Sequence, residues 1–392
     1  MANERDIIII GAGPAGLSLA IALADAGFGV TVVEKLPHAV LADPPADGRE
    51  IALTHRAVDI LQSLGMWQNY PAEDISPIRE ARVLDGKSPH FLGFDTHGTQ
   101  QTELGYLVPN HVIRKAAFEV ASSRPSIEII SDVAVSDVGT TADTAEVRLA
   151  DGRILTAPLM VAADSRFSDA RRRMGIGADM RDFGRTVIVC RFSHELPHHE
   201  IAHECFYYGR TLAVLPLHGL MSSTVITLSA DQSNAMLQMP VPEFEKLVSE
   251  QFDSRLGAMQ LVGERHSYPL VAVYAQRFAA HRFALLGDAA VGMHPVTAHG
   301  FNCGLYGVES LTRTVRGARA SGRDIGSMSV LARYQSEHRR ATRPIYLGTN
   351  VLVSLFTDDQ MPARFFRTAV LRLANRLPPL KATITRQLTG RA

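Results

Sequence analysis

The pattern of hydrophobic and polar positions near the N-terminus predicts a strand, a helix and a second strand. The β-branched run at residues 7–10 is typical of a strand buried on both faces of a parallel sheet. After a glycine-rich turn, a helix is expected over 17–26, ending at Gly27 in a left-handed C-cap. Residues 30–33 read as the second strand. Together these segments predict one βαβ unit.

The turn inside this unit carries a GxGxxG pattern, Gly11-Ala12-Gly13-Pro14-Ala15-Gly16. Gly11 permits a tight turn, Gly13 lets the backbone approach a pyrophosphate, and Gly16 lets the helix pack close to the strand. The N–H groups at the helix N-terminus, where Ala15 lies, attract phosphates. Glu34, at the end of the second strand, is expected to accept hydrogen bonds from adenosine ribose hydroxyls. The order of these features favours a dinucleotide site over a purely structural glycine turn.

The rest of the chain alternates between helical and β-like patterns. Helical periodicity is expected at 51–67, 112–121 and 242–259, and strands at 127–130, 146–149 and 283–286, with a hairpin at Asp151-Gly152. Several short β-like runs fall between 186 and 228. The fold class predicted is α/β, with a Rossmann-like nucleotide-binding domain interleaved with a strand-rich substrate domain and followed by a helical C-terminal segment.

The interleaving predicts discontinuous domains. The nucleotide-binding domain is expected at 1–75, 100–175 and 280–340, the substrate domain at 76–99 and 176–279, and the helical segment at 341–392.

Composition narrows the class of protein. With 40 basic and 40 acidic side chains among 392 residues, the net charge argues against a nucleic-acid partner. Cys190, Cys205 and Cys303 have no metal-ligand spacing, so we expect no metal and a reducing cytosol. The apolar run near the N-terminus is too short for a signal peptide, and no stretch reaches the roughly 20 residues of a membrane span. A cytoplasmic protein, soluble or peripheral to a membrane, is therefore expected.

Two later segments join the glycine turn in a recognisable order. One contains Asp164-Ser165 and Arg171-Arg172-Arg173, and the other is 287–295, which begins Gly287-Asp288. This order resembles the flavoprotein aromatic hydroxylases, the single-component FAD monooxygenases. Within that group, the ubiquinone-biosynthesis hydroxylases are the most similar, by the stretches 47–67, 294–305 and 377–381. The resemblance covers nearly the whole chain.

The resemblance implies FAD as cofactor and NAD(P)H as a transient reductant without a nucleotide domain of its own. It places Asp288 at the ribityl chain, and the stretch 295–302 beside the isoalloxazine ring. The cofactor-binding residues it implies are Gly11, Gly13, Ala15, Gly16, Glu34, Arg49, Arg114, Asp164, Gly287, Asp288, Gly300, Phe301 and Asn302. Without the resemblance, Arg114 reads as a solvated surface residue and Asp288 as a helix N-cap.

Three positions depart from the family pattern. Ser165 replaces the glycine of the usual Asp-Gly pair, Ala298-His299-Gly300 stands where Gly-Gln-Gly is common, and Gly307 replaces an acidic residue. Pro295 and His299 are the catalytic candidates. His299 is either a proton relay near the flavin or a residue that only fills the space of the glutamine. No general base is identified beyond it.

The activity implied is hydroxylation of the ring of a polyprenylated phenol or quinol by O2 through a flavin C4a-hydroperoxide, with C5 as the expected ring position. One alternative keeps the flavin and changes the substrate to a soluble aromatic or polyketide. Another is a non-catalytic flavin-binding scaffold of a quinone-synthesis complex, in which the changes at Ser165 and Gly307 signal lost turnover.

Charge is unevenly distributed along the chain. Residues 331–392 contain eleven basic and three acidic side chains, so their net charge of +8 is balanced by −8 in the first 330 residues. A helix over 361–377 places apolar side chains on one face and arginines on the other. It is expected either to bind an anionic surface at the inner membrane or a quinone-synthesis complex, or to pack on its own domain.

Overall fold

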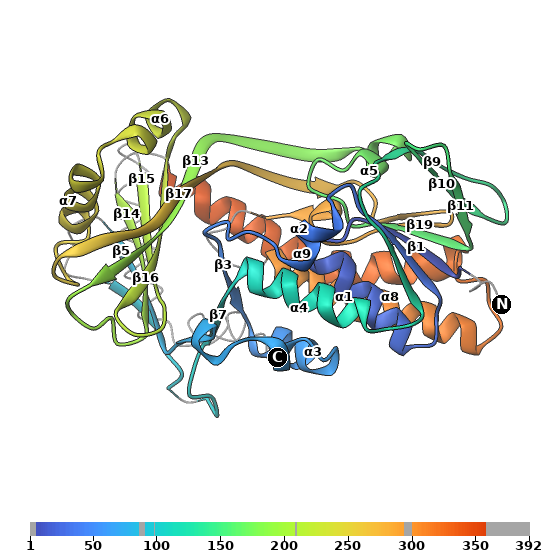
Figure 1. Cartoon of the computed structure of the whole chain (residues 1–392), viewed down its shortest axis with the longest axis horizontal. Helices are drawn as coiled ribbons and strands as arrows, with labels where there is room; N and C mark the ends of the chain where they lie inside the picture. The colour runs from blue at the N-terminus through green and yellow to red at the C-terminus, as the bar shows by residue number, and fades with distance from the viewer. Residues whose placement is uncertain (1–4, 86–90, 98, 208–209, 294–299, 358–392) are drawn as a thin grey trace.

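Two lobes joined by a pair of long strands make up the fold (Figure 1). The structure is a computed structural model that describes residues 5–85, 91–97, 99–207, 210–293 and 300–357. The joining strands are β13, Ala178–His194, and β17, Met259–Ala275, which pair antiparallel. Each has 17 residues, and at about 3.3 Å per residue each is about 55 Å long, enough to reach from one lobe to the other.

A mostly parallel sheet forms the centre of the six-stranded lobe. Its strand order is β18-β19-β12-β1-β2-β8, and only β18 runs antiparallel to its neighbour. The three central strands are buried along their whole length, as apolar strands covered on both faces are. The strands are Ala279–Ala280 (β18), Phe283–Leu285 (β19), Leu159–Ala162 (β12), Ile7–Ile10 (β1), Val30–Val33 (β2) and Ile127–Ile130 (β8).

Helices cover one face of this sheet, and a small antiparallel sheet covers the other (Figure 1). The helix after β1 lies against both α4 and α8, so the glycine turn is held between the sheet and α8. The helices are Pro14–Asp25 (α1), His38–Ala42 (α2), Asn110–Ser122 (α4), Asp169–Arg173 (α5), Gly300–Ala320 (α8) and Met328–Thr357 (α9). The small sheet contains Val135–Thr140 (β9), Ala145–Leu149 (β10) and Ile154–Ala157 (β11).

The eight-stranded lobe has the strand order β20-β17-β13-β16-β15-β14-β5-β6. Two helices, Ala230–Gln238 (α6) and Val241–Gln251 (α7), pack on one face over a separate apolar core. The remaining strands are Glu80–Asp85 (β5), Phe91–Phe94 (β6), Ile201–Tyr207 (β14), Arg210–Pro216 (β15), Met221–Ser229 (β16) and Val291–Gly292 (β20). A three-stranded sheet of Glu50–Leu53 (β3), Gly105–Pro109 (β7) and Ser76–Ile78 (β4) packs against the opposite face.

The fold class predicted from the sequence is confirmed, while two helix predictions were wrong in extent. The helical period at 51–67 is divided between β3 and α3, His55–Ser63, because the Thr54 side chain caps α3 by accepting a hydrogen bond from the Ala57 N–H. The helix expected over 242–259 ends at Gln251, and β17 begins at Met259. Gly27 has a φ of +86°, as its expected left-handed C-cap requires.

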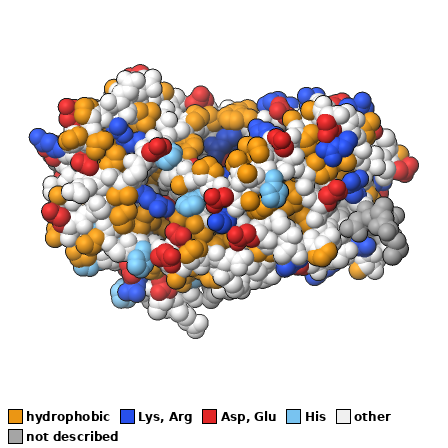
Figure 2. Space-filling view, in the orientation of Figure 1, with side chains coloured by type: hydrophobic (Ala, Val, Ile, Leu, Met, Phe, Trp, Pro, Cys, Tyr) orange, Lys and Arg blue, Asp and Glu red, His pale blue; other side chains and the backbone are white. Residues whose placement is uncertain are grey.

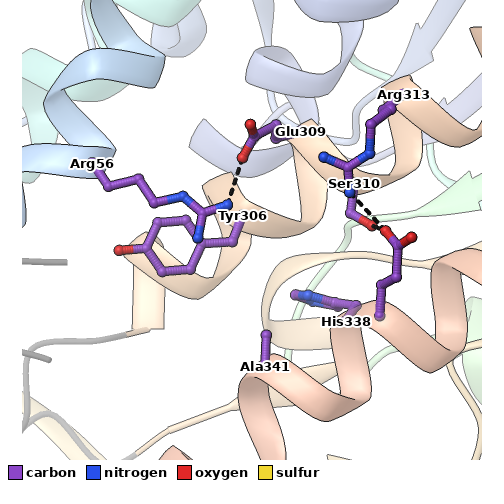
Figure 3. A pocket seen from close by; sticks show the side chains of 8 residues that line it. Arg56, Tyr306, Glu309, Ser310, Arg313, His338 and Ala341 are labelled. Atoms are coloured by element: carbon purple, nitrogen blue, oxygen red, sulfur yellow. Dashed lines mark hydrogen bonds and ion pairs between the residues drawn. The ribbon is translucent and has the colours of Figure 1, made fainter. Parts of the chain in front are cut away.

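A buried histidine lies between α8 and α9 beside a small pocket (Figure 3). The pocket of about 90 Å³ is lined by Arg56, Tyr306, Glu309, Ser310, Arg313, Glu337, His338 and Ala341. A Cβ atom at position 307 would lie 3.0 Å from the His338 ring and 2.8 Å from Leu286 Cδ1. Glycine at 307 therefore leaves room for this imidazole. Burial lowers the pKa of His338 to about 4.

Acid is expected to destabilise the protein through His338. Because its folded pKa lies below the unfolded value of about 6.5, its contribution is complete above pH 6.5 and is lost as the pH falls toward 4. Between pH 7 and pH 5 this loss amounts to about 2 kcal/mol. Urea unfolding of His338→Leu should show a smaller loss over that range than the wild type. The same slope in both proteins would contradict the assignment; His203, whose pKa burial also lowers to about 4, keeps part of the acid sensitivity in either case.

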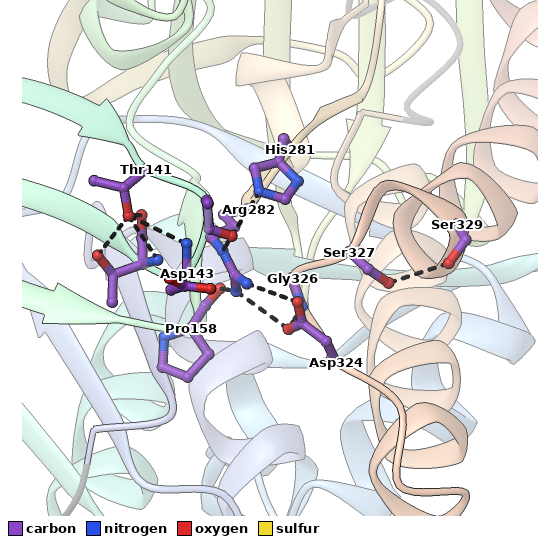
Figure 4. Close-up of polar contacts among 11 residues, drawn as sticks. Thr141, Asp143, Pro158, His281, Arg282, Asp324, Gly326, Ser327 and Ser329 are labelled. Carbon is purple, nitrogen blue, oxygen red and sulfur yellow. Dashed lines mark hydrogen bonds and ion pairs between the residues drawn. The ribbon is translucent and has the colours of Figure 1, made fainter.

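A buried arginine holds the α8–α9 connection against the sheet (Figure 4). Arg282 donates to the carbonyl oxygens of Ala142 and Pro158 and forms a two-pronged ion pair with Asp324. Gly326 lies so close that its Cβ atom would be 2.2 Å from the Pro158 carbonyl oxygen. These contacts fix the chain that leads from α8 into α9.

Charged side chains of both signs are interspersed over the face shown in Figure 2. Among the helices that the structure describes, none has the length and apolar character needed to cross a bilayer. The amphipathic helix predicted over 361–377 lies outside the described residues.

Candidate active site

The glycine turn after β1 is as tight as the GxGxxG pattern requires. Gly11 has a φ of +106°, and a Cβ atom there would lie 2.6 Å from the Ala163 carbonyl oxygen. A Cβ atom at Gly16 would lie 2.0 Å from the Gly11 carbonyl oxygen, so glycine is required for this approach of helix and strand. At Gly13 a Cβ atom would meet no described atom within 4 Å. Protein atoms therefore fill the space beside Gly11 and Gly16, whereas the space beside Gly13 is free of described atoms.

The N-terminus of α1 is free to bind an anion. Gly13 is the N-cap residue and provides no side-chain cap, and the first turn contains no acidic residue. The backbone N–H groups of Ala15 and Gly16 have no acceptor within the helix because they lie in its first turn. Together with the positive end of the helix dipole, they form a phosphate site.

Glu34 extends from the carboxyl end of β2 toward the same turn. Its Oε2 accepts a hydrogen bond from the Ala12 N–H at 2.7 Å, and its Oε1 accepts one from the Leu36 N–H at 3.0 Å. These bonds fix the carboxylate, and each oxygen keeps further acceptor capacity for a ribose hydroxyl.

Two more carboxylates follow the strands next to β1. Asp164 follows β12 and Asp288 follows β19, and the carboxyl ends of these parallel strands meet at one edge of the sheet. Asp164 Oδ1 is buried and has no hydrogen-bond partner among the described residues. Asp288 Oδ2 forms an ion pair with Arg166 at 2.9 Å. We call the turn 11–16 with Glu34, Asp164 and the segment 287–288 the nucleotide cradle.

Close packing holds the parts of the cradle together. A Cβ atom at Gly287, whose φ is +58°, would lie 3.1 Å from the Ala15 Cβ. A Cβ atom at Gly304 of α8 would lie 3.5 Å from the same Ala15 Cβ. The first turns of α1 and α8 and the Gly287-Asp288 segment are therefore in contact.

Arg171 packs beside the cradle; the sequence marked it only as the first of three consecutive arginines and gave it no role of its own. Its buried guanidinium donates to the carbonyl oxygens of Ala289 and Arg166, and desolvation lowers its pKa. Ser168 caps the short helix that carries it by accepting a hydrogen bond from the Arg171 N–H. The available signal was a serine three residues before an arginine, in the segment that follows β12 and contains Asp164.

The start of α8 is fixed to β3 by Asn302. This fully buried side chain donates to the Ala52 carbonyl oxygen and accepts from the Thr54 N–H. Its amide is thus engaged with protein backbone, so a contact with the flavin would come from the backbone of 300–302. Gly300 begins the helix, and Phe301 packs against the main core. Pro295 and His299, the catalytic candidates, lie outside the described residues.

The two predicted arginines lie apart from the cradle contacts. Arg49 forms an ion pair with Asp47 and lies over the Tyr268 ring, 5.2 Å from its centroid. Burial alone would raise the pKa of Asp47, but hydrogen bonds from Arg49 and Asn110 lower it overall. Arg114, one turn after Asn110 on α4, is half-buried and makes no hydrogen bond or ion pair with the described residues.

One face of the eight-stranded sheet, the face on which the three-stranded sheet packs, is mostly apolar. We call this surface the inner face; its central side chains, by strand register, are Val83, Ala202, Glu204, Ala213, Leu215, Ser223, Val225, Val189 and Arg191. Several of them keep accessible surface, whereas the opposite face is buried under α6 and α7. A fixed, partly accessible apolar face suits an aromatic substrate.

One ion pair joins the inner face to the segment that carries Arg49. Both Nε and a terminal nitrogen of Arg191 contact Glu50 Oε1, at 2.9 Å and 2.6 Å. Glu50 Oε2 is buried without a described partner, and burial raises the pKa of Glu50 although Arg191 opposes this. Close by, Gly48 is so near β17 that its Cβ atom would lie 2.6 Å from the His266 ring. A cleft of about 100 Å³ opens beside Glu50 and Arg191.

The comparisons with known proteins agree with this geometry. The family model described as "FAD binding domain" matches residues 4–345, so the chain belongs to that family. It is an FAD-dependent monooxygenase, with FAD as its cofactor and NAD(P)H as reductant.

Two relatives align over nearly the whole chain. The chain is 48% identical over 394 residues to the ubiquinone hydroxylase UbiM of Neisseria meningitidis serogroup C / serotype 2a, covering 100% of this chain and 86% of that protein. It is 34% identical to the ubiquinone hydroxylase UbiL of Rhodospirillum rubrum, covering 98% and 89%. The solved structure of p-nitrophenol 4-monooxygenase PnpA from Pseudomonas putida DLL-E4 has the same fold, with a TM-score of 0.79, 18% identity and 99% of each chain covered.

The residues of the cradle fit FAD. The open side of Gly13, the free N–H groups of α1 and the unpartnered Asp164 oxygen are the features that a bound dinucleotide would use. A Cβ atom at position 13 would point into the space that a pyrophosphate needs.

Asp288→Ala is expected to weaken FAD binding about 10- to 100-fold, the range for loss of a hydrogen bond to a charged group. Asp169→Ala is the matched control, because Asp169 is also paired with an arginine but is exposed outside the cradle. Flavin occupancy after dialysis and fluorescence titration of the apoprotein would measure the effect. Full occupancy in Asp288→Ala would contradict a role for this carboxylate.

Proposed function

We propose that this enzyme hydroxylates the aromatic ring of a polyprenylated phenol or quinol in ubiquinone biosynthesis. The observation that carries the proposal is the position of the inner face. This face is mostly apolar and partly accessible, and it lies against the segment that contains Gly48 and Glu50. The full-length similarity to two ubiquinone hydroxylases supports this substrate class.

Different parts of the chain would bind the cofactor and the substrate. The cradle would hold FAD by its phosphates, ribose and ribityl chain, and bound FAD would supply activation of O2. The inner face would hold the ring and exclude water from it. Hydroxylation at C5, the route through a C4a-hydroperoxide, and roles for His299 and Pro295 stay predictions. Binding of the basic C-terminal segment to an anionic membrane or a quinone-synthesis complex is likewise proposed on its charge alone.

Complementation would test the substrate. The chain is expressed in strains that each lack one ring hydroxylase of quinone synthesis, and the intermediates that accumulate are identified by mass spectrometry. We expect the intermediate blocked at C5 to disappear and quinone to return. Asp288→Ala serves as the control for flavin-dependent rescue.

The other outcomes separate the alternatives. If no strain is rescued although the purified holoprotein oxidises NAD(P)H in the presence of a soluble phenol, the substrate is a different aromatic. If the holoprotein oxidises no NAD(P)H with any ring substrate, the scaffold interpretation replaces this proposal.

A further inference from the structure

The inner face carries one acidic side chain among apolar neighbours. Glu204 lies in β14, where its register partners are Val83 in β5 and Ala213 in β15. The same row continues through Val225 to Val189 in β13. An acidic residue is unexpected in such a row, because burying a carboxyl group among apolar side chains costs free energy unless the group gains a hydrogen bond.

No such hydrogen bond is provided by the described part of the chain. Within it, the Glu204 carboxyl makes no hydrogen bond or ion pair, although the residue lies deep in the eight-stranded lobe. It nevertheless keeps accessible surface, as do Val83 and Val225 in the same row. Because the Glu204 side chain is accessible and has no partner among the described residues, its carboxyl is available to a ligand on the inner face.

The protonation state of Glu204 suits a neutral ligand. Burial raises the pKa of its carboxyl to about 8. Near neutral pH the group is therefore mostly protonated, and it can both donate and accept a hydrogen bond. On the adjoining strand, Arg82 precedes Val83, so its side chain lies on the other face of the sheet, where it is paired with Glu80.

The position of Glu204 on the inner face suits contact with the edge of a substrate ring that points away from the cofactor. The segment that leads into β3 touches the sheet at β13 and β17, through Glu50 with Arg191 and through Gly48 with His266. Glu204 lies three strands from β13, about 14 Å at the usual strand spacing. A ring lying over Val225 and Ala213 would have one edge toward the cofactor side and the other toward Glu204.

We propose that the Glu204 carboxyl accepts a hydrogen bond from a hydroxyl group of the substrate's aromatic ring and so sets which ring edge faces the cofactor. This inference rests on the proposed function for its substrate class. It makes Glu204 a substrate-binding residue that discriminates a free ring hydroxyl from a ring without one.

A pair of ligands that differ only at the oxygen tests the assignment. 2-Prenylphenol and its methyl ether are titrated into the FAD-loaded protein, and binding is followed by the change in flavin absorbance. The wild type should bind the phenol about 10-fold more tightly than the ether, as expected for one hydrogen bond. Glu204→Leu should bind both equally, while Glu204→Gln, which keeps a donor and an acceptor, should retain a preference for the phenol.

Val225→Ala is the matched control on the same row, and it should weaken both ligands without changing their ratio. Circular dichroism melting checks that each variant is folded. Equal binding of phenol and ether by the wild type, or a preserved preference in Glu204→Leu, would overturn the assignment. Product formation is measured in the same samples. Absence of hydroxylated phenol with the preference intact would count against the proposed function while supporting the role of Glu204.

Discussion

Replacing Gly16 with alanine is expected to produce a less stable protein that loses FAD. The new Cβ atom would lie 2.0 Å from the Gly11 carbonyl oxygen, and both groups belong to backbone that cannot turn away. α1 must then move from β1, at a cost of about 1–3 kcal/mol or more for overpacking. The movement also separates Ala15 from Gly287 and Gly304, so the whole cradle widens.

The loss of FAD affinity should be about 100-fold, the cost of a displacement near 1 Å at a positioned group. Gly13→Ala should separate the two effects. Its Cβ atom meets no described atom within 4 Å, so stability should stay unchanged while the methyl group obstructs the pyrophosphate. Gly139→Ala in β9, equally free of neighbours and remote from the cradle, should change neither property. Urea unfolding and flavin titration of the three apoproteins would measure both; unchanged FAD affinity in Gly16→Ala would contradict the role of this turn.

The cradle could be anticipated from the sequence because its determinants are local. Gly11, Gly13 and Gly16 act within one turn, and Glu34 follows the next strand of the same βαβ unit. The segments at Asp164 and Asp288 could be added because strands that flank β1 in parallel end at the same edge of the sheet. The resemblance supplied their roles, and the structure supplies their proximity.

The extent of single elements was harder to predict. The long strand β13 was seen only as a short β-like run, because charged residues such as Arg181 and Asp182 interrupt the apolar pattern, and β17 was not predicted. These side chains are exposed on the part of β13 that spans the two lobes, where hydrophobic alternation is not required. The helix predicted over 51–67 was wrong in extent, because the apolar spacing did not show that Thr54 caps the helix at its start.

Contacts between distant segments could not be predicted. Arg191 and Glu50 are 141 residues apart and meet only because the inner face docks on β3. The same holds for Gly307, which leaves room for the ring of His338 on another helix. No spacing within the sequence indicates such pairs.

Removing the Arg191 side chain is expected to destabilise the protein by about 3–5 kcal/mol, because Arg191→Leu leaves the Glu50 carboxylate buried without its partner. The Glu50 side chain is fully buried, and one of its oxygens is already without a described partner. The exposed pair of Arg153 and Asp151 offers a matched control: Arg153→Leu should leave stability unchanged. Urea unfolding of the FAD-loaded proteins would measure both.

The pH dependence of the stability lost in Arg191→Leu tests whether the unpaired Glu50 carboxylate causes the loss. Burial already raises the pKa of Glu50, and loss of Arg191 removes the group that opposes this rise. A carboxyl group whose folded pKa exceeds its unfolded value contributes most at low pH and costs stability as the pH increases. The difference between wild type and Arg191→Leu should therefore be smaller at pH 5 than at pH 8. The double variant Arg191→Leu with Glu50→Leu should recover most of the lost stability, since no charge is left to bury. A deficit that is independent of pH and persists in the double variant would show that Arg191 acts by packing and not by pairing with Glu50.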